Sequence, residues 1–416
     1  MLDILPGVLD EVLPLSQRHR QDLGKTIRSL WEDLTSEREH RTEEYLGNPA
    51  YVSAYARYFL PWNLLRLSSI LSSAPMAKED LNILADIGSG PLSLPLALWA
   101  SRPDLRDKAL KIYCVDRTEK IMKAGQAIFE SACVRAGASL PPWRIELRRQ
   151  SFGEALPEKA DLVSASNLLN EFFWKSKAPL ATRALVTARQ FTSYISDRGS
   201  ILIMEPGDPR SGTIIAALRA ALIDFGGQPL SPCPHSLSCP MPGLFRGLET
   251  PGQGFGEESK RLEPKVAMPK PRDKYPWCHF SLGTAAAPRW LTELSDSAGL
   301  AKDKIVFSYL LSAFGHEGGY PESQSISPIA RQIPERSSRQ KQKEKSAAAG
   351  SPVRVVSEAF SLPGGKQGRY ACSSRGYCLV RSAKAETELA SGDLLPPPAR
   401  GAEGMDEKSG AISISY

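Results

Sequence analysis

Apolar side chains recur at helical spacing through the first part of the chain, among mostly charged neighbours. Positions three and four apart lie on one face of a helix, and this spacing relates Leu23, Ile27, Leu30 and Leu34. A second run, residues 51–71, is richer in aromatic residues, and we expect Pro61 to break or kink it. Residues 1–80 are therefore predicted to form an N-terminal helical cap on the domain that follows.

The pattern changes near residue 82, where short apolar runs begin to alternate with helical segments. The apolar runs predict buried strands at 82–90, 110–116, 143–151, 161–169 and 199–207. Strands that alternate with helices in this way pair in parallel and carry helices on both faces of the sheet. The fold class predicted for residues 81–227 is therefore α/β, with a Rossmann-like sheet.

The rest of the chain divides by composition. Proline, glycine and cysteine are frequent after the last of these strands, and a polar stretch separates the later strand-like runs. We expect, in order, a cysteine-rich segment (228–290), a return to the sheet (291–317), a basic polar linker (318–352), a small C-terminal β module (353–385) and a disordered tail (386–416).

Composition narrows the function classes. The chain is 42% apolar, enough for a real core, and it has no apolar run long enough to span a membrane. Its first residues lack a basic stretch and a small-residue cleavage site, so we expect no secretory signal and a cytoplasmic location. Lys and Arg exceed Asp and Glu by 52 − 46 = 6, which permits an anionic partner. The cysteine count of seven is odd, which disfavours a disulfide scaffold.

A glycine turn follows the first predicted strand. Gly88 and Gly90, after Asp86, let a backbone approach a ligand closely. Asp116 ends the second strand, where a carboxylate can accept hydrogen bonds from both hydroxyls of a ribose. A P-loop is excluded because no GKS or GKT follows. This is a nucleotide or SAM site, or a crevice that has lost its ligand.

The acceptor side of such a site would lie after the fourth strand. Its candidate residues are Asn167, Asn170 and Glu171. The sequence there, ASNLLNEF, is not the NPPY or DPPY of enzymes that methylate exocyclic amines. Pro232-Cys233 lies after the fifth strand, so Cys233 is rejected as a cytosine-C5 nucleophile. The acceptor chemistry, and whether there is catalysis at all, stay open.

Soft thiolate ligands gather in the second half of the chain, and they suit zinc or an iron–sulfur cluster. On the residues alone zinc is slightly favoured, with His235 and His279 as spare ligands, and buried free cysteine remains an alternative. Cys114 and Cys133 fall inside a strand and a helix and are assigned to the core. The candidate ligands are Cys233, Cys239, Cys278, Cys372 and Cys378.

Three segments carry a family resemblance: LADIGSGPLSLPLALWA, ASNLLNEF and LIMEPGDPRSG. Together they resemble class I SAM-dependent methyltransferases and, more narrowly, the methyltransferase-like proteins of the mitochondrial small ribosomal subunit and their bacterial relatives. YLGNPAYVSAYARYFLP, SPCPHSLSCP, WCHFS and KIVFSYLL extend the resemblance over about residues 45–385. One departure is Leu92, where the family has a small residue, and we expect its bulk to tighten or exclude the cofactor pocket.

The resemblance implies ligands for particular residues. SAM would bind at Asp86, Gly88, Gly90 and Asp116. The family's 4Fe–4S cluster would be held by Cys233, Cys239, Cys278 and Cys372, with Cys378 as the substitute for the last. The spacer between Cys239 and Cys278 is longer than expected for the family and resembles an inserted surface loop.

The resemblance also implies a function. It implies a SAM-dependent methyltransferase associated with the small ribosomal subunit and its rRNA, with no membrane partner and monomeric away from the ribosome. The alternative is a non-catalytic assembly factor that keeps the fold to bind rRNA. The run 331–345 has six basic and two acidic residues and is expected to contact phosphates, together with Arg354, Lys366, Arg369 and Arg375.

Overall fold

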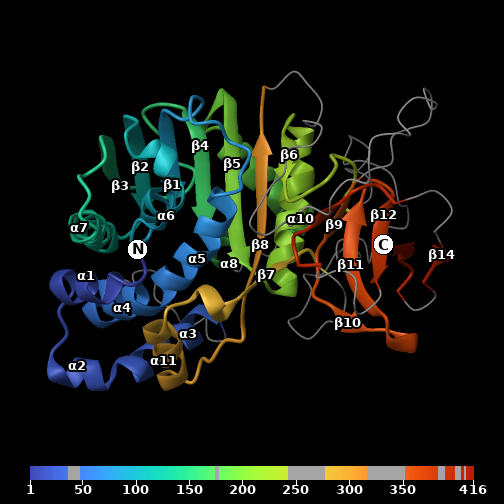
Figure 1. Ribbon diagram of the computed structural model, residues 1–416. Helices are drawn as coiled ribbons and strands as arrows, with labels where there is room; N and C mark the ends of the chain where they lie inside the picture. Colours follow the sequence, from blue (N-terminus) through green and yellow to red (C-terminus); the bar gives the residue numbers. More distant parts are fainter. Residues whose placement is uncertain are drawn as a thin grey trace.

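The computed structural model describes residues 1–35, 47–173, 178–241, 277–315, 352–382, 389–398, 404–406 and 409–416. The basic run 331–345 and the inserted loop expected before Cys278 lie outside these residues. Figure 1 shows a large central sheet, N-terminal helices packed below one end of it, and a second sheet formed by the C-terminal part of the chain.

The large sheet begins as predicted and ends differently. Its strands run in the order β3-β2-β1-β4-β5-β8-β6, with β7 paired to β8. The strands β1 to β5 pair in parallel, but β8 enters antiparallel between β5 and β6. The bounds are β1 Ile83–Ile87, β2 Leu110–Asp116, β3 Trp143–Arg149, β4 Ala160–Ser166, β5 Ile195–Pro206, β6 Gln228–Ser231, β7 Phe280–Gly283 and β8 Lys304–Ala313.

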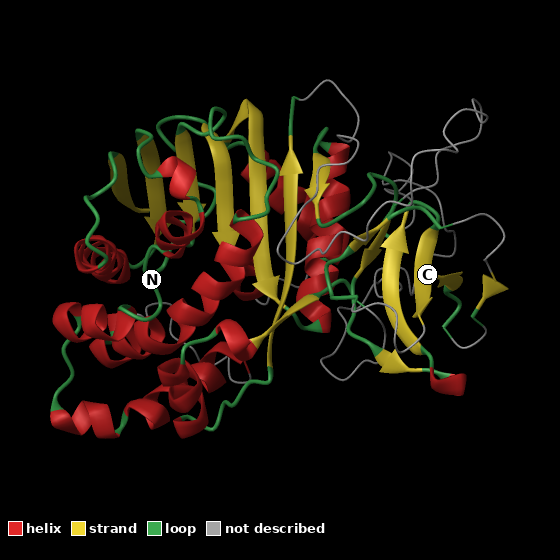
Figure 2. Ribbon diagram, viewed as in Figure 1, coloured by secondary structure: helices red, strands yellow, loops and turns green. Residues whose placement is uncertain are grey.

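Helices cover both faces of this sheet, as expected (Figure 2). Successive side chains of a strand point to opposite faces, so Leu84 packs with helices α6 and α7 while Ala85 packs with α9 and α10. The bounds of the helical elements here are α6 Ser93–Ser101, η3 Pro103–Leu105, α7 Glu119–Arg135, α8 Leu169–Phe172, α9 Leu180–Thr192 and α10 Pro209–Asp224.

The N-terminal helices form the cap that the periodicity predicts. They are α1 Leu5–Val12, α2 Gln17–Gln21, α3 Leu23–Thr35, α4 Pro49–Ala54, η2 Tyr55–Phe59 and α5 Leu60–Leu71. The break expected at Pro61 takes the form of a π-helical turn, η2, just ahead of the proline. The amide of Leu60 donates to the carbonyl of Tyr55, five residues back, and α5 then continues.

Residues from far along the chain complete the cap. Helix α11, Arg289–Ser297, packs on α3 after the short helix η6, Thr284–Ala286. The indole Nε1 of Trp290 donates to the carbonyl of Leu2 at 3.2 Å, and the Tyr58 hydroxyl donates to the carbonyl of Leu300 at 3.3 Å. The cap is therefore built from both ends of the α/β domain.

The C-terminal sheet reaches further than the sequence suggested. Its strands run β13-β9-β11-β12-β15-β14, with β10 paired to β11. The disordered tail expected at 386–416 is wrong for β15, which pairs in parallel with β12 and buries Ile414. The elements are β9 Val353–Val355, β10 Phe360–Ser361, η7 Pro363–Gly365, β11 Gln367–Ser373, β12 Gly376–Ser382, β13 Leu394–Leu395, β14 Gly404–Met405 and β15 Ile412–Ser415.

Among the helices that the structure describes, none combines the length and the apolar character needed to cross a bilayer.

Candidate functional site

A cavity of about 450 Å³ lies between the cap and the carboxyl ends of the parallel strands. Figure 1 shows the arrowheads of β4 and β5 pointing toward the cap helices. In open α/β folds ligands bind at this edge of the sheet. The sheet contributes polar groups to the cavity wall, among them Gly88, Gly90, Asp116, Ser151, Asn167 and Asn170. The cap contributes the aromatic side chains Trp31, Tyr55, Tyr58, Phe59 and Trp62.

The turn after β1 requires its glycines. Gly88 and Gly90 have φ angles of +72° and +52°, a region that L side chains rarely adopt. A Cβ added to Gly88 would lie 3.0 Å from Cδ1 of Leu168 in the loop after β4. The backbone amides of Gly88 and Ser89 both donate to the carbonyl of Val115, at 2.8 and 3.0 Å. The turn is thereby fixed against the end of β2.

Asp116 links the glycine turn to the end of β2. Its Oδ2 accepts a hydrogen bond from the amide of Gly90 at 3.0 Å, and its Oδ1 accepts one from the amide of Thr118 at 2.9 Å. The side chain therefore holds the loop in shape while it lines the cavity.

Asp86 is placed beneath the cavity rather than on its wall. Its side chain is 2% exposed and accepts a hydrogen bond from the amide of Leu94 at 3.4 Å, at the start of α6. Burial raises the pKa of Asp86 to about 7, and the charge of Asp116 contributes in the same direction. A direct contact between Asp86 and a cofactor stays a prediction.

The raised pKa of Asp86 predicts a pH effect on stability. The pKa of Asp86 is about 7 in the folded protein, against an ordinary value of 3.8. Between these pH values the carboxyl therefore binds a proton in the folded state but not in the unfolded state. The free energy of unfolding consequently falls as the pH rises through this range. The loss is up to about 4 kcal/mol. Asp86→Asn keeps an acceptor for Leu94 and should remove this loss. Urea unfolding from about pH 4 to about pH 8 measures this loss, and parallel curves for the two proteins would contradict it.

Leu92 does not tighten the cavity, contrary to expectation. Its side chain is fully buried in the core with α6 and is not part of the cavity wall. The backbone of Leu92 is left-handed, with φ of 58°, which costs a non-glycine residue about 1–2 kcal/mol. The bulk of the leucine thus fills the core below the turn.

The acceptor side is lined by amides. Asn167 and Asn170 contribute to the cavity wall, and the backbone of Asn167 is left-handed, with φ of 57°. Glu171 is within α8, but its side chain lies outside the described residues. Sequence reasoning missed Glu205, which is fully buried and accepts the amides of Leu169 and Asn170 at 2.8 and 3.1 Å. The sequence feature that could have identified Glu205 is its place as the single acidic residue in the apolar run 199–207.

Two cations on the cap side were also missed. Arg66 of α5 and Lys302, which precedes β8, both line the cavity. In the sequence Arg66 is a single arginine in an apolar helix, and Lys302 is one of two lysines beside a strand. Only the packing of the cap on the sheet brings them together.

The structure separates the two candidates for the fourth cysteine ligand. Cys372 of β11 is opposite Tyr377 of β12, and Cys378 is opposite Ala371, so the two cysteines point to opposite faces of the C-terminal sheet. Cys372 packs in the same core as Cys239 and Cys278, whereas Cys378 is buried inside the C-terminal module. The face of Cys372 is the one turned toward the other cysteines.

Electrostatic interactions link the same four thiols. Burial raises the pKa of Cys278 well above its usual value, and the neighbouring Cys372, Cys233 and Cys239 raise it further. Burial likewise raises the pKa of Cys239 to about 11. In the part of the chain that the structure describes, no three His, Cys, Asp or Glu side chains have the arrangement of a metal site.

A buried arginine accompanies this cysteine cluster (Cys233, Cys239, Cys278 and Cys372). The Nε of Arg219, a residue only 3% exposed, donates to the Sγ of Cys233 at 3.1 Å. His235 is buried with its two ring nitrogens lacking hydrogen-bond partners, and burial lowers its pKa to about 4. His279 stacks on Trp277, with ring centroids 4.6 Å apart. The cluster therefore has a cation beside it and a neutral imidazole nearby.

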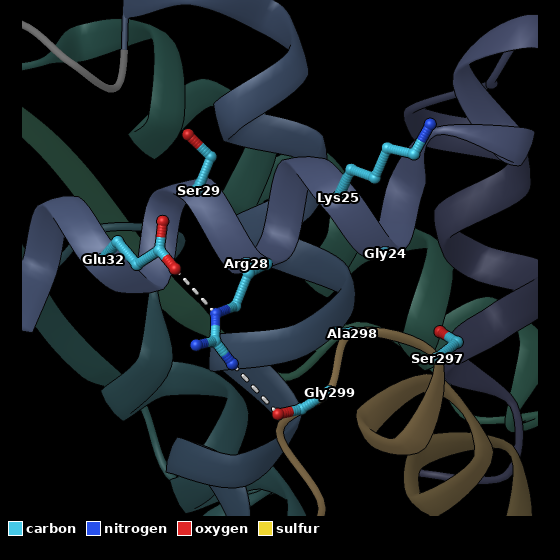
Figure 3. Close-up of a pocket in the computed structure, with 8 residues that line it drawn as sticks. All are labelled: Gly24, Lys25, Arg28, Ser29, Glu32, Ser297, Ala298 and Gly299. Atoms are coloured by element: carbon cyan, nitrogen blue, oxygen red, sulfur yellow. Dashed lines mark hydrogen bonds and ion pairs between the residues drawn. The ribbon is translucent and has the colours of Figure 1, made fainter.

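A second hollow, of about 350 Å³, lies where α3 meets the end of α11 (Figure 3). Arg28 spans it, donating from Nε to Glu32 at 2.8 Å and from a terminal nitrogen to the carbonyl of Gly299 at 3.1 Å. Arg28 thus joins α3 to the segment after α11, and we interpret the hollow as a packing junction of the cap.

Comparison with solved structures gives loose similarities. TnmH is 24% identical with a TM-score of 0.28, over 44% of this chain and 50% of its own length. A protein from Nostoc punctiforme, provisionally described as an O-methyltransferase, is 16% identical with a TM-score of 0.33, over 54% of this chain and 67% of its own. A provisionally described S-adenosylmethionine-dependent methyltransferase from Listeria monocytogenes is 9% identical with a TM-score of 0.30, over 61% of this chain and 98% of its own.

Because these TM-scores are below 0.5, we base the fold on the strand order itself, a Rossmann-like sheet accompanied by a second, C-terminal sheet. The chain spans half the length of TnmH. Comparison with curated proteins gives no significant match. Residues 49–245 match the family described as "Mitochondrial small ribosomal subunit Rsm22". The family resemblance predicted from the sequence is therefore confirmed over residues 49–245.

Proposed function

We propose that this protein binds SAM in the cavity beneath the cap and methylates rRNA of the small ribosomal subunit. The observation that carries the proposal is the joining of Gly88, Gly90 and Asp116 at one wall of a cavity at the carboxyl ends of β1 and β2. SAM supplies an electrophilic methyl group. Asp116 would accept hydrogen bonds from ribose hydroxyls, and the glycines would admit the cofactor to the backbone.

The acceptor wall supports a second candidate, a non-catalytic assembly factor that binds rRNA. Among the described side chains that line the cavity after β4, Asn167 and Asn170 are amides and none titrates. Amides orient a base by hydrogen bonding but do not take up a proton at neutral pH. The family description supports association with the small subunit in both cases. A cytoplasmic location stays a prediction, since that description names mitochondria.

We further propose that Cys233, Cys239, Cys278 and Cys372 hold an iron–sulfur cluster, with zinc as the alternative. Support comes from the mutual electrostatic influence of the thiols and from Arg219, whose guanidinium would stabilise thiolates. A bound cluster would supply a covalent link among the loop after β6, the loop before β7 and β11. Thiolate ligation couples metal binding to folding.

Titration of SAM into anaerobically purified protein tests the first proposal, with Asp116→Ala as the variant. Loss of hydrogen bonds to a charged group costs about 1.5–3 kcal/mol each, so we expect affinity to fall at least about 100-fold. Asp161→Ala is the matched control, since Asp161 accepts the amides of Asn82 and Ile83, at 2.9 and 3.0 Å, at the opposite edge of the sheet.

We expect Asp161→Ala to lower stability without changing the affinity for SAM by more than about twofold. Equal losses in the two variants would mean that Asp116 acts only through the fold. No binding of SAM to the unaltered, metal-loaded protein would refute the methyltransferase proposal and leave the assembly factor as the leading function.

A further inference from the structure

Arg66 and Lys302 are two partly buried cations at the cavity wall without a carboxylate partner among the described residues. A terminal nitrogen of Arg66 donates to Oδ1 of Asn63 at 2.9 Å, and its Nε is buried with no hydrogen-bond partner. The ammonium of Lys302 lies 5.8 Å from the ring centroid of Tyr58 and 5.9 Å from that of Trp62. Both cations line the cavity.

Two neighbouring cations at this wall carry a desolvation cost. Burial lowers the pKa of Arg66 to about 10 and that of Lys302 to about 8, and the charge of Arg66 lowers the pKa of Lys302 further. Arg57, by contrast, is paired with a carboxylate: it donates to Asp10 at 2.8 Å and also to two backbone carbonyls. Two neighbouring, partly buried cations without a carboxylate partner among the described residues indicate a site for an anion.

The topology puts this pair on the acceptor side of the cavity. Strand β8 runs antiparallel to β5, and Phe307 is opposite Pro206, the last residue of β5. Lys302 precedes β8 and therefore lies beyond the carboxyl end of β5. Asp116 ends β2, three strand positions away in the sheet, roughly 14 Å at the usual spacing. The carboxylate for the ribose and the cation pair thus mark opposite ends of the cavity.

Aromatic rings accompany the cations. Tyr58 and Trp62 lie under Lys302, and Phe172, which is 41% exposed, lines the same cavity after β4. Unpaired bases bind proteins by stacking on such rings, while adjacent cations bind the phosphates. A cavity with aromatic rings and adjacent cations fits a nucleotide, which has a base and a phosphate, better than it fits a small carboxylate.

We propose that Arg66 and Lys302 form the phosphate-binding site for one nucleotide of the RNA acceptor, whose base stacks on the aromatic wall. The inference rests on the proposed function in that this nucleotide is the acceptor presented to the cofactor. The carboxylate of SAM is the other candidate anion, and the experiment below distinguishes it from an RNA phosphate.

The test is calorimetric binding of each ribonucleoside 5′-monophosphate, of its nucleoside and of SAM to the full-length protein. We expect at least one monophosphate to bind about tenfold or more tightly than its nucleoside. Arg66→Met and Lys302→Met should each erase that difference and leave the affinity for SAM within twofold. Arg289→Met, which removes an exposed charge paired with Glu293 on α11, should change neither.

Folding of the variants is checked at the same time. Each Met variant removes one of two neighbouring, partly buried cations, so melting temperatures should be equal to or above that of the unaltered protein. Lys302→Arg keeps the charge and should retain the preference for the monophosphate.

Several results would overturn the proposal. They are no phosphate preference in the unaltered protein, a preference that survives both Met variants, or a loss of SAM affinity in those variants, which would assign the pair to the cofactor carboxylate. A phosphate preference in a protein that does not bind SAM would uphold this site while refuting the methyltransferase proposal.

Discussion

Gly125→Ala is expected to destabilise the protein by about 3–5 kcal/mol, although alanine favours helices over glycine by about 1 kcal/mol. Gly125 lies in α7, where a Cβ would be 2.3 Å from the carbonyl carbon of Pro91 and 2.6 Å from its oxygen. These are backbone atoms of the glycine turn, so α7 and the turn would have to separate. A loss of this size lowers the melting temperature by roughly 10 °C for a domain of this size.

Thermal unfolding and SAM titration measure the two consequences, since a displaced turn should also weaken the cofactor site. The control is Gly283→Ala, because Gly283 has no heavy atom within 4 Å of an added Cβ and an ordinary φ. A melting temperature for Gly125→Ala at or above that of the unaltered protein would show that α7 does not need this close approach.

Cys372→Ala is expected to abolish metal binding, while Cys378→Ala leaves it intact. Both residues are buried in neighbouring strands of one sheet, yet Cys372 faces the cysteine cluster and Cys378 faces the module's own core. Iron, sulfide and zinc content per chain after anaerobic purification measure the effect. Because ligation is coupled to folding, the C-terminal module should also become sensitive to proteolysis in Cys372→Ala.

The measured iron, sulfide and zinc contents distinguish the cluster from zinc. Iron and sulfide that vanish only in Cys372→Ala support the cluster, and one zinc with no iron supports the alternative. Equal metal loss in the two variants, with equal loss of stability, would show that the module's packing rather than a specific thiol retains the metal.

The parts of the site that could be predicted lie at strand ends. Asp116 and the glycines are found from sequence because buried strands are short and apolar, and because parallel strands bring their carboxyl ends to one edge. The face of the sheet to which a strand residue points is harder to predict than the position of the strand in the sequence. Cys372 and Cys378 are six positions apart but are joined by a tight turn, and only the register of β11 on β12 decides which face each takes.

Other features depend on contacts that no local pattern records. Arg66 and Lys302 meet because α5 and the segment before β8 pack together, although they are far apart in sequence. The antiparallel entry of β8 cannot be told from its apolar run, since burial on both faces makes parallel and antiparallel strands look alike. The strand β15 escaped notice because Pro396 to Pro398 dominate the composition of the tail.

The contact between Trp290 and the carbonyl of Leu2 has a consequence for the protein's synthesis. At about 5–20 residues per second, roughly a quarter of a minute to a minute separates the appearance of these two residues from the ribosome. During that interval the apolar residues of α3 and η2 that pack on α11 and β8 have no final partner, since α11 and β8 have not been made. The cap of a nascent chain can therefore reach its final packing only after residue 313 has emerged.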